Sequence, residues 1–499
     1  MGFADRRVRA GVVWAGRAVL VLVIAVTATI LALAVTPKVS VSAFGQTVQV
    51  GAVPPSPSLG LSGPGRADLF GEGAVDTVQQ FGGPIRPLIV WKEFNRNDEA
   101  SQFLQSSSAN GRRTVATGSR EVGDLLADGW KRYFSRLLLL SAVLGAALYL
   151  LGVGAAALFG RSWPHPDRKL RLALLAAATV TSLAVSGGFT ALTVSTAVRQ
   201  LGGVTSLSDL VGTARLAPVP PTAGPPRTGI DVVVIGDSTA AGIGNSPLPR
   251  PTREDTACQR SSDAYAGAIR SISGRTTLNL ACSSATIAAG LLGPQQAGGI
   301  TLPAQVGALR AVQSPSAVVV SVGANDVGWS DFLRYCYGLP RCDDEASDRL
   351  FLSRLDAFKL RYAQLLQQLS DLPGRPDVIV TTYYDPFGSG FDCAELRDPS
   401  AGTGAPPGYG FGPDPGEDNQ EQKIERKIDP LRSELRKMNA VLEQGAEAFG
   451  FMVVHPSFAG HELCTGQPWV QGMADPAPFH PRAAGELAIA AAVLPHVPV

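Results

Sequence analysis

Three short motifs in the second half of this chain carry side chains that together could break an ester bond. The run VVVIGDSTAAGIG places Ser238 directly after an apolar, β-branched stretch, and VSVGANDVGW places Asn325 after a second one. The run FHPRAAGELAIAAAVL places His480 before an apolar helical pattern. A serine that loses its proton to a histidine can attack an acyl carbon, and a side-chain amide can stabilise the resulting oxyanion.

Each of these residues, taken alone, has a simpler structural explanation. By position alone Ser238 is better explained as the N-cap of the following helix. A single histidine is usually structural, although histidine is scarce here, with five in 499 residues. Two motifs at strand ends and a histidine at a helix start, in this chain order, favour a Ser/His site with an amide-lined oxyanion hole.

A parallel sheet is needed to bring these motifs together. Helical patterns, clearest over residues 421–449 with an expected break at Pro430, alternate with short apolar runs rich in β-branched residues. The runs are DVVVI at 231–235, AVVVSV at 317–322, DVIVTT at 377–382 and GFMVV at 450–454. This alternation predicts an α/β fold, a three-layer α/β/α sandwich with a mostly parallel sheet, over residues 230–499. Reactive groups gather at the carboxyl ends of the strands in such sheets.

In this order the motifs resemble those of the SGNH, or GDSL-type, hydrolase superfamily. GDS at 236–238 is similar to its nucleophile block, GAND at 323–326 to its Gly-x-Asn-Asp block, and HP at 480–481 to its histidine block. FAGHELCTGQPW at 458–469 and NLACSSAT at 279–286 resemble the secreted actinobacterial lipase and esterase branch. The resemblance leaves the N-terminal half of the chain uncovered.

The resemblance implies a flavodoxin-like hydrolase domain and a role for four residues. Ser238 would attack an ester carbonyl, and His480 would accept its proton and return it to the leaving alcohol. The backbone N–H groups of Ser238 and Ser284 and the side-chain amide of Asn325 would line the oxyanion hole. Ser284 stands where the family usually has glycine, so it must tolerate the local backbone angles. No metal ion or organic cofactor is implied.

The group that orients His480 stays open between two candidates. The family's usual acid lies three residues before the histidine, where this chain has Ala477. Asp475 is the nearest carboxylate, but it lies two residues too early, and Pro476 and Pro478 stiffen the path. Some relatives use a backbone carbonyl instead, and the C=O of Ala477, the matching group, is favoured here.

Six cysteines all lie in the second half of the chain, and none forms a CxxC pair. An even number in one region predicts three disulfides and an oxidising, extracytoplasmic location, with buried free thiols as the alternative. Spacing alone fixes none of the pairings. The actinobacterial branch pairs its cysteines in sequence order, which implies Cys258–Cys282, Cys336–Cys342 and Cys393–Cys464.

The first half of the chain is apolar enough to cross a membrane three times. Apolar segments at 18–35, 137–159 and about 172–197 each approach the roughly 30 Å thickness of bilayer hydrocarbon. Arginines precede the first segment and crowd the link between the second and third, so both clusters are expected in the cytoplasm. The first segment is interpreted as an anchor rather than a cleaved signal peptide.

The predicted organisation therefore has five parts. They are a cytoplasmic N-terminus with the first transmembrane helix (1–35), a small β-containing ectodomain (36–136), a transmembrane hairpin (137–197), a Pro-rich linker (198–229) and the hydrolase domain (230–499). Alternation on either side of Phe44 and Gly45 predicts a hairpin in the ectodomain, whose expected role is structural or partner-binding. The run LAPVPPTAGPPRTG at 216–229 predicts a semi-extended spacer.

Charge and motifs exclude several functions. A net charge of +1, without a dense basic stretch, argues against nucleic acid. The absence of G-x-S-x-G, G-x-G-x-x-G and a P-loop lysine argues against an α/β-hydrolase and a nucleotide-binding protein.

The sequence predicts a multi-pass protein of the cell membrane whose extracytoplasmic domain is a serine esterase or lipase. An acyltransferase or deacetylase acting on a cell-envelope glycan or lipid is the alternative, since an acyl-enzyme serves both reactions. A catalytically silent binding domain is disfavoured by the joint presence of Ser238, Asn325 and His480. The expected partners are a membrane and an ester substrate, a lipid or an acylated envelope glycan; the oligomeric state is not predicted.

Overall fold

The computed structural model describes residues 2–43, 46–54, 62–71, 74–91, 118–158, 167–201, 204, 207–212, 217, 219–338, 342–387, 420–463, 465–472 and 474–498. These residues form two compact units. Apart from short segments, the N-terminal unit ends at Gly212, and the C-terminal unit comprises the rest of the chain. Each unit is described by itself.

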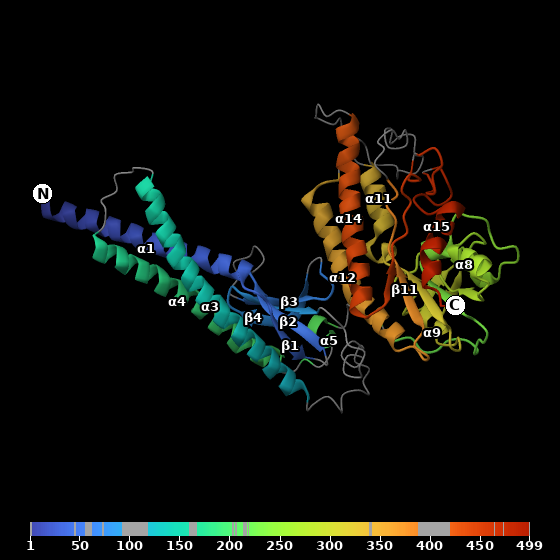
Figure 1. The fold of residues 1–499 in the computed structure, drawn as a ribbon, viewed down its shortest axis with the longest axis horizontal. Coiled ribbons are helices and arrows are strands. Elements are labelled where there is room, and N and C mark those ends of the chain that lie inside the picture. Colours follow the sequence, from blue (N-terminus) through green and yellow to red (C-terminus); the bar gives the residue numbers. More distant parts are fainter. Residues whose placement is uncertain are drawn as a thin grey trace. The chain divides into compact units, whose positions relative to one another are not determined.

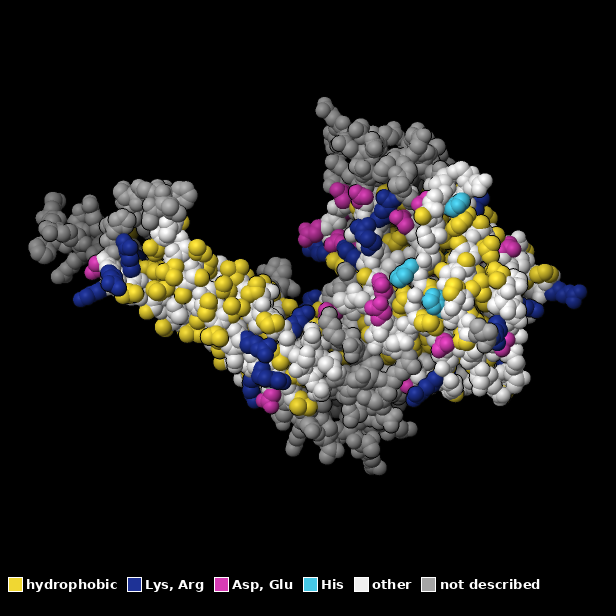
Figure 2. Space-filling model, in the orientation of Figure 1, with side chains coloured by type: hydrophobic (Ala, Val, Ile, Leu, Met, Phe, Trp, Pro, Cys, Tyr) yellow, Lys and Arg dark blue, Asp and Glu magenta, His cyan; other side chains and the backbone are white. Residues whose placement is uncertain are grey.

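Three long helices dominate the N-terminal unit: α1 (Gly2–Val35), α3 (Gly118–Leu158) and α4 (Arg168–Leu201). Within the described residues, each has a stretch long and apolar enough to cross a membrane, at Gly11–Val35, Leu125–Ala155 and Arg168–Leu201. Hydrophobic side chains cover the helix surfaces in Figure 2, and Leu139 and Leu151 are 70% and 69% exposed. Apolar surface on this scale is unfavourable in water and suits lipid.

Small and hydroxyl-bearing residues line the contacts between these helices. Ala25, Ala28 and Ala32 of α1 are completely buried. The hydroxyls of Ser141 on α3 and Ser186 on α4 lie 2.7 Å apart. Small residues let helix backbones approach closely, and hydroxyl pairs join helices where water is absent.

A five-stranded sheet completes the described N-terminal unit, together with the short helix α5 (Leu207–Val211). Its strands are β1 (Val39–Ala43), β2 (Gln46–Val53), β3 (Ser62–Asp68), β4 (Val75–Gly82) and β5 (Arg86–Trp91), in the order β1-β2-β5-β3-β4. β1 and β2 pair antiparallel as the sequence predicts, although Phe44 and Gly45 themselves lie outside the described residues. The indole N–H of Trp130 on α3 donates to the carbonyl of Gly51 at 2.8 Å, so this sheet packs against α3.

The C-terminal unit is built on a second, wholly parallel five-stranded sheet. Its strands are β6 (Val232–Gly236), β7 (Thr277–Asn279), β10 (Ala317–Ser321), β11 (Asp377–Thr381) and β12 (Met452–Val454), in the order β12-β11-β10-β6-β7. This is the flavodoxin-like order, in which the second strand lies outside the first and the later strands follow on the other side. The sequence prediction missed β7, whose three residues TLN include a single apolar side chain.

Helices cover both faces of this sheet (Figure 1). α8 (Tyr265–Ser273) and α15 (Ala483–Val493) pack together on one face, and α12 (Glu345–Ser370) and α14 (Gln420–Ala448) pack together on the other. The remaining described elements are short: α6 (Ser238–Ala241), α7 (Arg253–Cys258), α9 (Gln305–Leu309), α10 (Ala324–Val327), α11 (Trp329–Gly338), the hairpin β8 (Gln295–Ala297) and β9 (Ile300–Leu302), and a 3₁₀ turn (Leu494–His496). The three-layer α/β/α sandwich is therefore confirmed.

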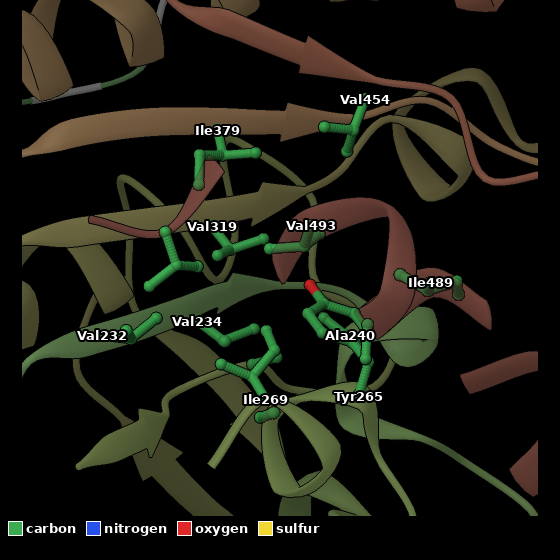
Figure 3. Packing of buried hydrophobic residues seen from close by; sticks show 14 of the residues in the cluster. Val232, Val234, Ala240, Tyr265, Ile269, Val319, Ile379, Val454, Ile489 and Val493 are labelled. Carbon is green, nitrogen blue, oxygen red and sulfur yellow. The ribbon is translucent and has the colours of Figure 1, made fainter. Parts of the chain in front are cut away.

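A buried hydrophobic core holds α8 and α15 on their face of the sheet (Figure 3). Its members come from four strands, β6, β10, β11 and β12, and from the two helices. They include Val232, Val234, Val319, Ile379, Ile269, Ile489 and Val493, each at most 2% exposed. Burying one such side chain stabilises the fold by about 1.5–3 kcal/mol. Because His480 lies just before α15, this core also determines where the histidine can reach.

One element differs from the sequence expectation. Pro430 does not break its helix, because α14 runs through it. Proline removes one intrahelical hydrogen bond, and the buried apolar residues Ile428, Leu431, Leu435 and Met438 around it hold the helix in place.

The described part of the expected spacer is hydrogen-bonded to the domain that follows it. Backbone N–H groups of Ala223 and Arg227 donate to the carbonyls of Gly307 and Ala311 at 2.9 and 2.8 Å, and Gln313 donates back to Arg227 at 2.8 Å. The compact C-terminal unit accordingly begins before Ile230. Prolines prevent a regular strand here but leave enough donors and carbonyls for docking.

Two disulfides are present among the described residues. They join Cys258 to Cys282 and Cys336 to Cys342, the first two predicted pairs. The predicted pair Cys393–Cys464 lies outside the described residues.

Candidate active site

The turn that carries Ser238, the predicted nucleophile, begins where β6 ends and is called the nucleophile turn below. A Cβ atom at Gly236 would lie 2.2 Å from the carbonyl oxygen of Ser321, so only glycine fits here. The N-cap of α6 is Asp237, whose carboxylate accepts the N–H of Thr239 at 3.0 Å. Ser238 is thus the first residue of the helix, and its hydroxyl is not needed as a cap.

The hydroxyl of Ser238 meets the imidazole of His480. Oγ of Ser238 lies 2.8 Å from Nε2 of His480, the separation expected between a nucleophile and its general base. Nδ1 of the same ring lies 3.1 Å from the carbonyl oxygen of Pro478. A carbonyl only accepts, so Nδ1 carries the proton in this contact and Nε2 is left to accept the serine proton.

Both predicted orienting groups are corrected by this geometry. The carbonyl of Ala477 accepts the backbone N–H of His480 at 3.2 Å rather than the ring. The carboxylate of Asp475 lies 2.6 Å from Nη2 of Arg482 and accepts the N–H of Gly472 at 2.7 Å. The backbone supplies the reason, since Phe479 adopts a left-handed φ of +66°. With this turn at Phe479, the imidazole ring of His480 contacts the carbonyl of Pro478, one residue after the predicted carbonyl of Ala477.

Ser284 adopts the glycine-like backbone that its role requires. Its φ is +63°, in the left-handed region that side chains other than glycine enter at some energetic cost. Within the described residues, neither the N–H of Ser284 nor that of Ser238 donates to a protein acceptor. The side-chain amide of Asn325 donates to the carbonyl of Ala285 at 3.0 Å, beside Ser284. The three predicted oxyanion donors therefore lie in loops that meet at one edge of the sheet.

Gln305 is a site residue that sequence reasoning missed. Its side-chain amide binds both backbone groups of Gly236, accepting the N–H at 2.8 Å and donating to the carbonyl at 2.9 Å. The same carbonyl accepts the N–H of Cys282 at 3.1 Å, two residues before Ser284. The side chain of Gln305 therefore holds the backbone of Gly236, where the nucleophile turn starts. A buried glutamine in the otherwise apolar helix α9 was the available signal.

Tyr383, at the carboxyl end of β11, was also missed. Its hydroxyl donates to Oδ2 of Asp237 at 2.5 Å and accepts the N–H of Ala324 at 3.2 Å. Complete burial raises the pKa of Asp237 to about 6, although the hydrogen bonds from Tyr383 and Thr239 act to lower it. The run TTYYDP follows an apolar strand, as the motifs of Ser238 and Asn325 do, and this was the available signal.

Comparison with known proteins identifies relatives of the C-terminal unit. The sequence profile described as "GDSL-like Lipase/Acylhydrolase family" matches residues 234–488, just over half of the chain. Lipase 1 of Streptomyces coelicolor is 27% identical over 300 residues, covering 58% of this chain and 94% of that protein. A lipase of Streptomyces rimosus is 25% identical over 264 residues, covering 51% and 82% of the two chains. The crystal structure of an extracellular lipase from Streptomyces rimosus matches with a TM-score of 0.36 at 23% identity, covering 53% of this chain and 97% of that chain.

Proposed function

Because this chain belongs to the GDSL-like lipase/acylhydrolase family and is an enzyme of the lipase and esterase type, we propose that it is a membrane-anchored, extracytoplasmic serine esterase. The observation that carries the proposal is the 2.8 Å contact between Oγ of Ser238 and Nε2 of His480. It links the nucleophile and histidine motifs, which are far apart in the sequence.

In the first half of the reaction an acyl-enzyme forms on Ser238. His480 Nε2 takes the proton of Oγ as Oγ bonds to the ester carbonyl carbon. The carbonyl oxygen becomes an oxyanion and receives hydrogen bonds from the N–H groups of Ser238 and Ser284 and from the side-chain amide of Asn325. Collapse of this intermediate breaks the bond to the alcohol oxygen, which takes the proton back from Nε2.

In the second half a water molecule repeats these steps on the acyl-enzyme. Nε2 of His480 accepts a proton from the water, whose oxygen bonds to the acyl carbon. The bond to Ser238 then breaks, Oγ regains the proton, and the carboxylic acid leaves. The carbonyl of Pro478 accepts the Nδ1 proton throughout, so Nε2 is the nitrogen that takes up and returns the transferred proton.

In the part of the chain that the structure describes, three apolar helices and two disulfides support the proposed location. Disulfides persist outside the reducing cytoplasm, which matches the topology predicted from the arginine clusters. An esterase held at a membrane in this way would meet lipid esters or acylated envelope glycans. Transfer of the acyl group to an alcohol on such a glycan uses the same acyl-enzyme, so product analysis must distinguish it from hydrolysis.

The test is covalent labelling of the full-length protein in detergent with a fluorophosphonate, followed by assays on aryl esters of increasing chain length. We expect wild type to be labelled at Ser238 and to release free acid. Ser238→Ala should be neither labelled nor active, whereas Ser271→Ala, at an exposed serine of α8, should match wild type. Ester hydrolysis at the wild-type rate by Ser238→Ala contradicts the proposal.

A further inference from the structure

Gln471 makes an unusual number of hydrogen bonds to the segment that carries His480. Its backbone N–H donates to the carbonyl of His480 and its carbonyl accepts the N–H of Phe479, both at 2.8 Å. The residue is only 3% exposed, so these bonds are shielded from water. The backbone of the histidine segment is therefore paired directly to Gln471.

The side chain of Gln471 joins that segment to the nucleophile turn. Its Nε2 donates to the carbonyl of Pro481 at 3.1 Å and to the carbonyl of Ile243 at 2.9 Å. Its Oε1 accepts the N–H of Ala477 at 3.2 Å. One buried amide thus contacts the chain on both sides of His480 and the chain that follows Ser238.

The surroundings leave this amide little freedom. A Cβ atom at Gly244 would lie 2.3 Å from Oε1 of Gln471, so the nucleophile segment approaches the side chain as closely as its glycine permits. On the other side, the hydroxyl of Tyr384 donates to the carbonyl of Phe479 at 2.7 Å, and its ring stacks on Phe458. The turn before His480 is therefore held from two directions.

We propose that Gln471 is a positioning residue that keeps Nε2 of His480 within hydrogen-bond distance of Ser238, an inference that rests on the proposed function. In a Ser-His-Asp triad a carboxylate both fixes the tautomer of the histidine and orients its ring. Here Nδ1 lies 3.1 Å from the neutral carbonyl of Pro478, and a hydrogen bond to a neutral acceptor is weaker than one to a carboxylate. The Gln471 amide adds rigidity by fixing the backbone from which the ring projects.

The test compares two substitutions of Gln471 with a matched control in the full-length protein. Gln471→Glu keeps the shape and the acceptor for Ala477 but loses the two donated hydrogen bonds; Gln471→Met loses all three side-chain bonds. The control is Gln364→Met, since Gln364 is equally buried and its amide binds both backbone groups of Ala217. Each protein is assayed for kcat, KM, the rate of fluorophosphonate labelling and Tm.

We expect both Gln471 variants to lose about 10- to 100-fold in kcat, because small displacements of a catalytic base have effects of this size. Fluorophosphonate labelling should slow in parallel, while KM changes by less than about threefold. Gln364→Met should lower Tm comparably and keep the wild-type kcat. A Gln471→Glu variant with kcat within twofold of wild type would overturn the inference, as would an equal loss of kcat in Gln364→Met. Failure of the proposed function is a different result, namely an active Ser238→Ala variant.

Discussion

The hydroxyl of Tyr383 binds the carboxylate of Asp237 at 2.5 Å and so joins the end of β11 to the nucleophile turn. The same oxygen accepts the N–H of Ala324, one residue before the oxyanion candidate Asn325. Tyr383 therefore connects the two motifs that carry the proposed nucleophile, Ser238, and the proposed oxyanion donor, Asn325. A change in this hydroxyl should therefore affect the spacing between the two motifs.

Tyr383→Phe is expected to lower kcat at least about 10-fold and to destabilise the fold by about 1–3 kcal/mol, because the buried carboxylate of Asp237 and the part-buried N–H of Ala324 each lose a hydrogen bond. Tyr362→Phe is the matched control, since the Tyr362 hydroxyl is also buried and binds the carbonyl of Leu442 at 3.0 Å, away from the catalytic motifs. The control should lose similar stability and keep kcat. Equal kcat values for the two variants would show that Tyr383 serves stability alone.

Asp237 should make stability depend on pH below neutrality. Burial raises its pKa to about 6 from a usual value near 4, so the folded chain keeps this proton longer than the unfolded chain does. The contribution of Asp237 to stability therefore falls as pH rises from about 4 to 6 and is level above that. Asp237→Asn removes this titration. The Tm of the variant minus the Tm of wild type should therefore increase as the pH rises from 4.5 to 7. Parallel Tm curves for the two proteins across this range would contradict the assignment.

The sequence predicted the α/β/α fold and the Ser238–His480 contact because both follow from local signals. Buried parallel strands are continuous apolar runs, and their carboxyl ends must share one edge of the sheet. β7 escaped notice because a strand of three residues leaves no pattern. Pro430 was misread because a single proline signals a break, whereas the buried side chains around it determine the outcome.

The supporting contacts could not be predicted, because they depend on which backbone atoms face one another. Gln305 and Gln471 each bind backbone groups distant in sequence, and no residue type marks the partner. The group that contacts Nδ1 of His480 was predicted wrongly for the same reason. Phe479 has a left-handed φ, and the imidazole ring of His480 contacts the carbonyl of Pro478 instead of that of Ala477. Bulky residues rarely adopt this φ, so the sequence offered no reason to expect it.

Asp475→Ala should leave kcat within a few-fold of wild type. Loss of a true triad acid lowers kcat by about 10⁴-fold, but the carboxylate of Asp475 is occupied by Arg482 and Gly472. The ion pair between Asp475 and Arg482 is partly exposed, because the two side chains are 31% and 44% accessible. Its loss should destabilise the protein by no more than about 1 kcal/mol. His480→Ala, assayed beside it, should abolish activity. A collapse of kcat in Asp475→Ala would restore the carboxylate as the orienting group.

Asn325→Ala should reduce kcat by about 10²- to 10³-fold, the usual effect of removing one oxyanion donor. KM should change little, because the oxyanion exists only after the ester carbonyl is attacked. The same substitution frees the carbonyl of Ala285, so Tm must be measured alongside kcat. Full activity in a folded Asn325→Ala protein would remove this side chain from the mechanism.

Ser284 offers a test that separates its backbone from its side chain. The proposed donor is the backbone N–H, and φ at this position is +63°, so Ser284→Gly should keep the wild-type kcat and stabilise the fold slightly. Ser284→Val should lose activity, because a β-branched residue strongly disfavours this φ and would turn the N–H away from the oxyanion. The side chain is exposed, so valine meets no packing obstacle and its effect comes from the backbone. Measuring kcat and Tm for both variants checks the argument: a large loss in Ser284→Gly would show that the hydroxyl, and not the N–H, is the group the reaction uses.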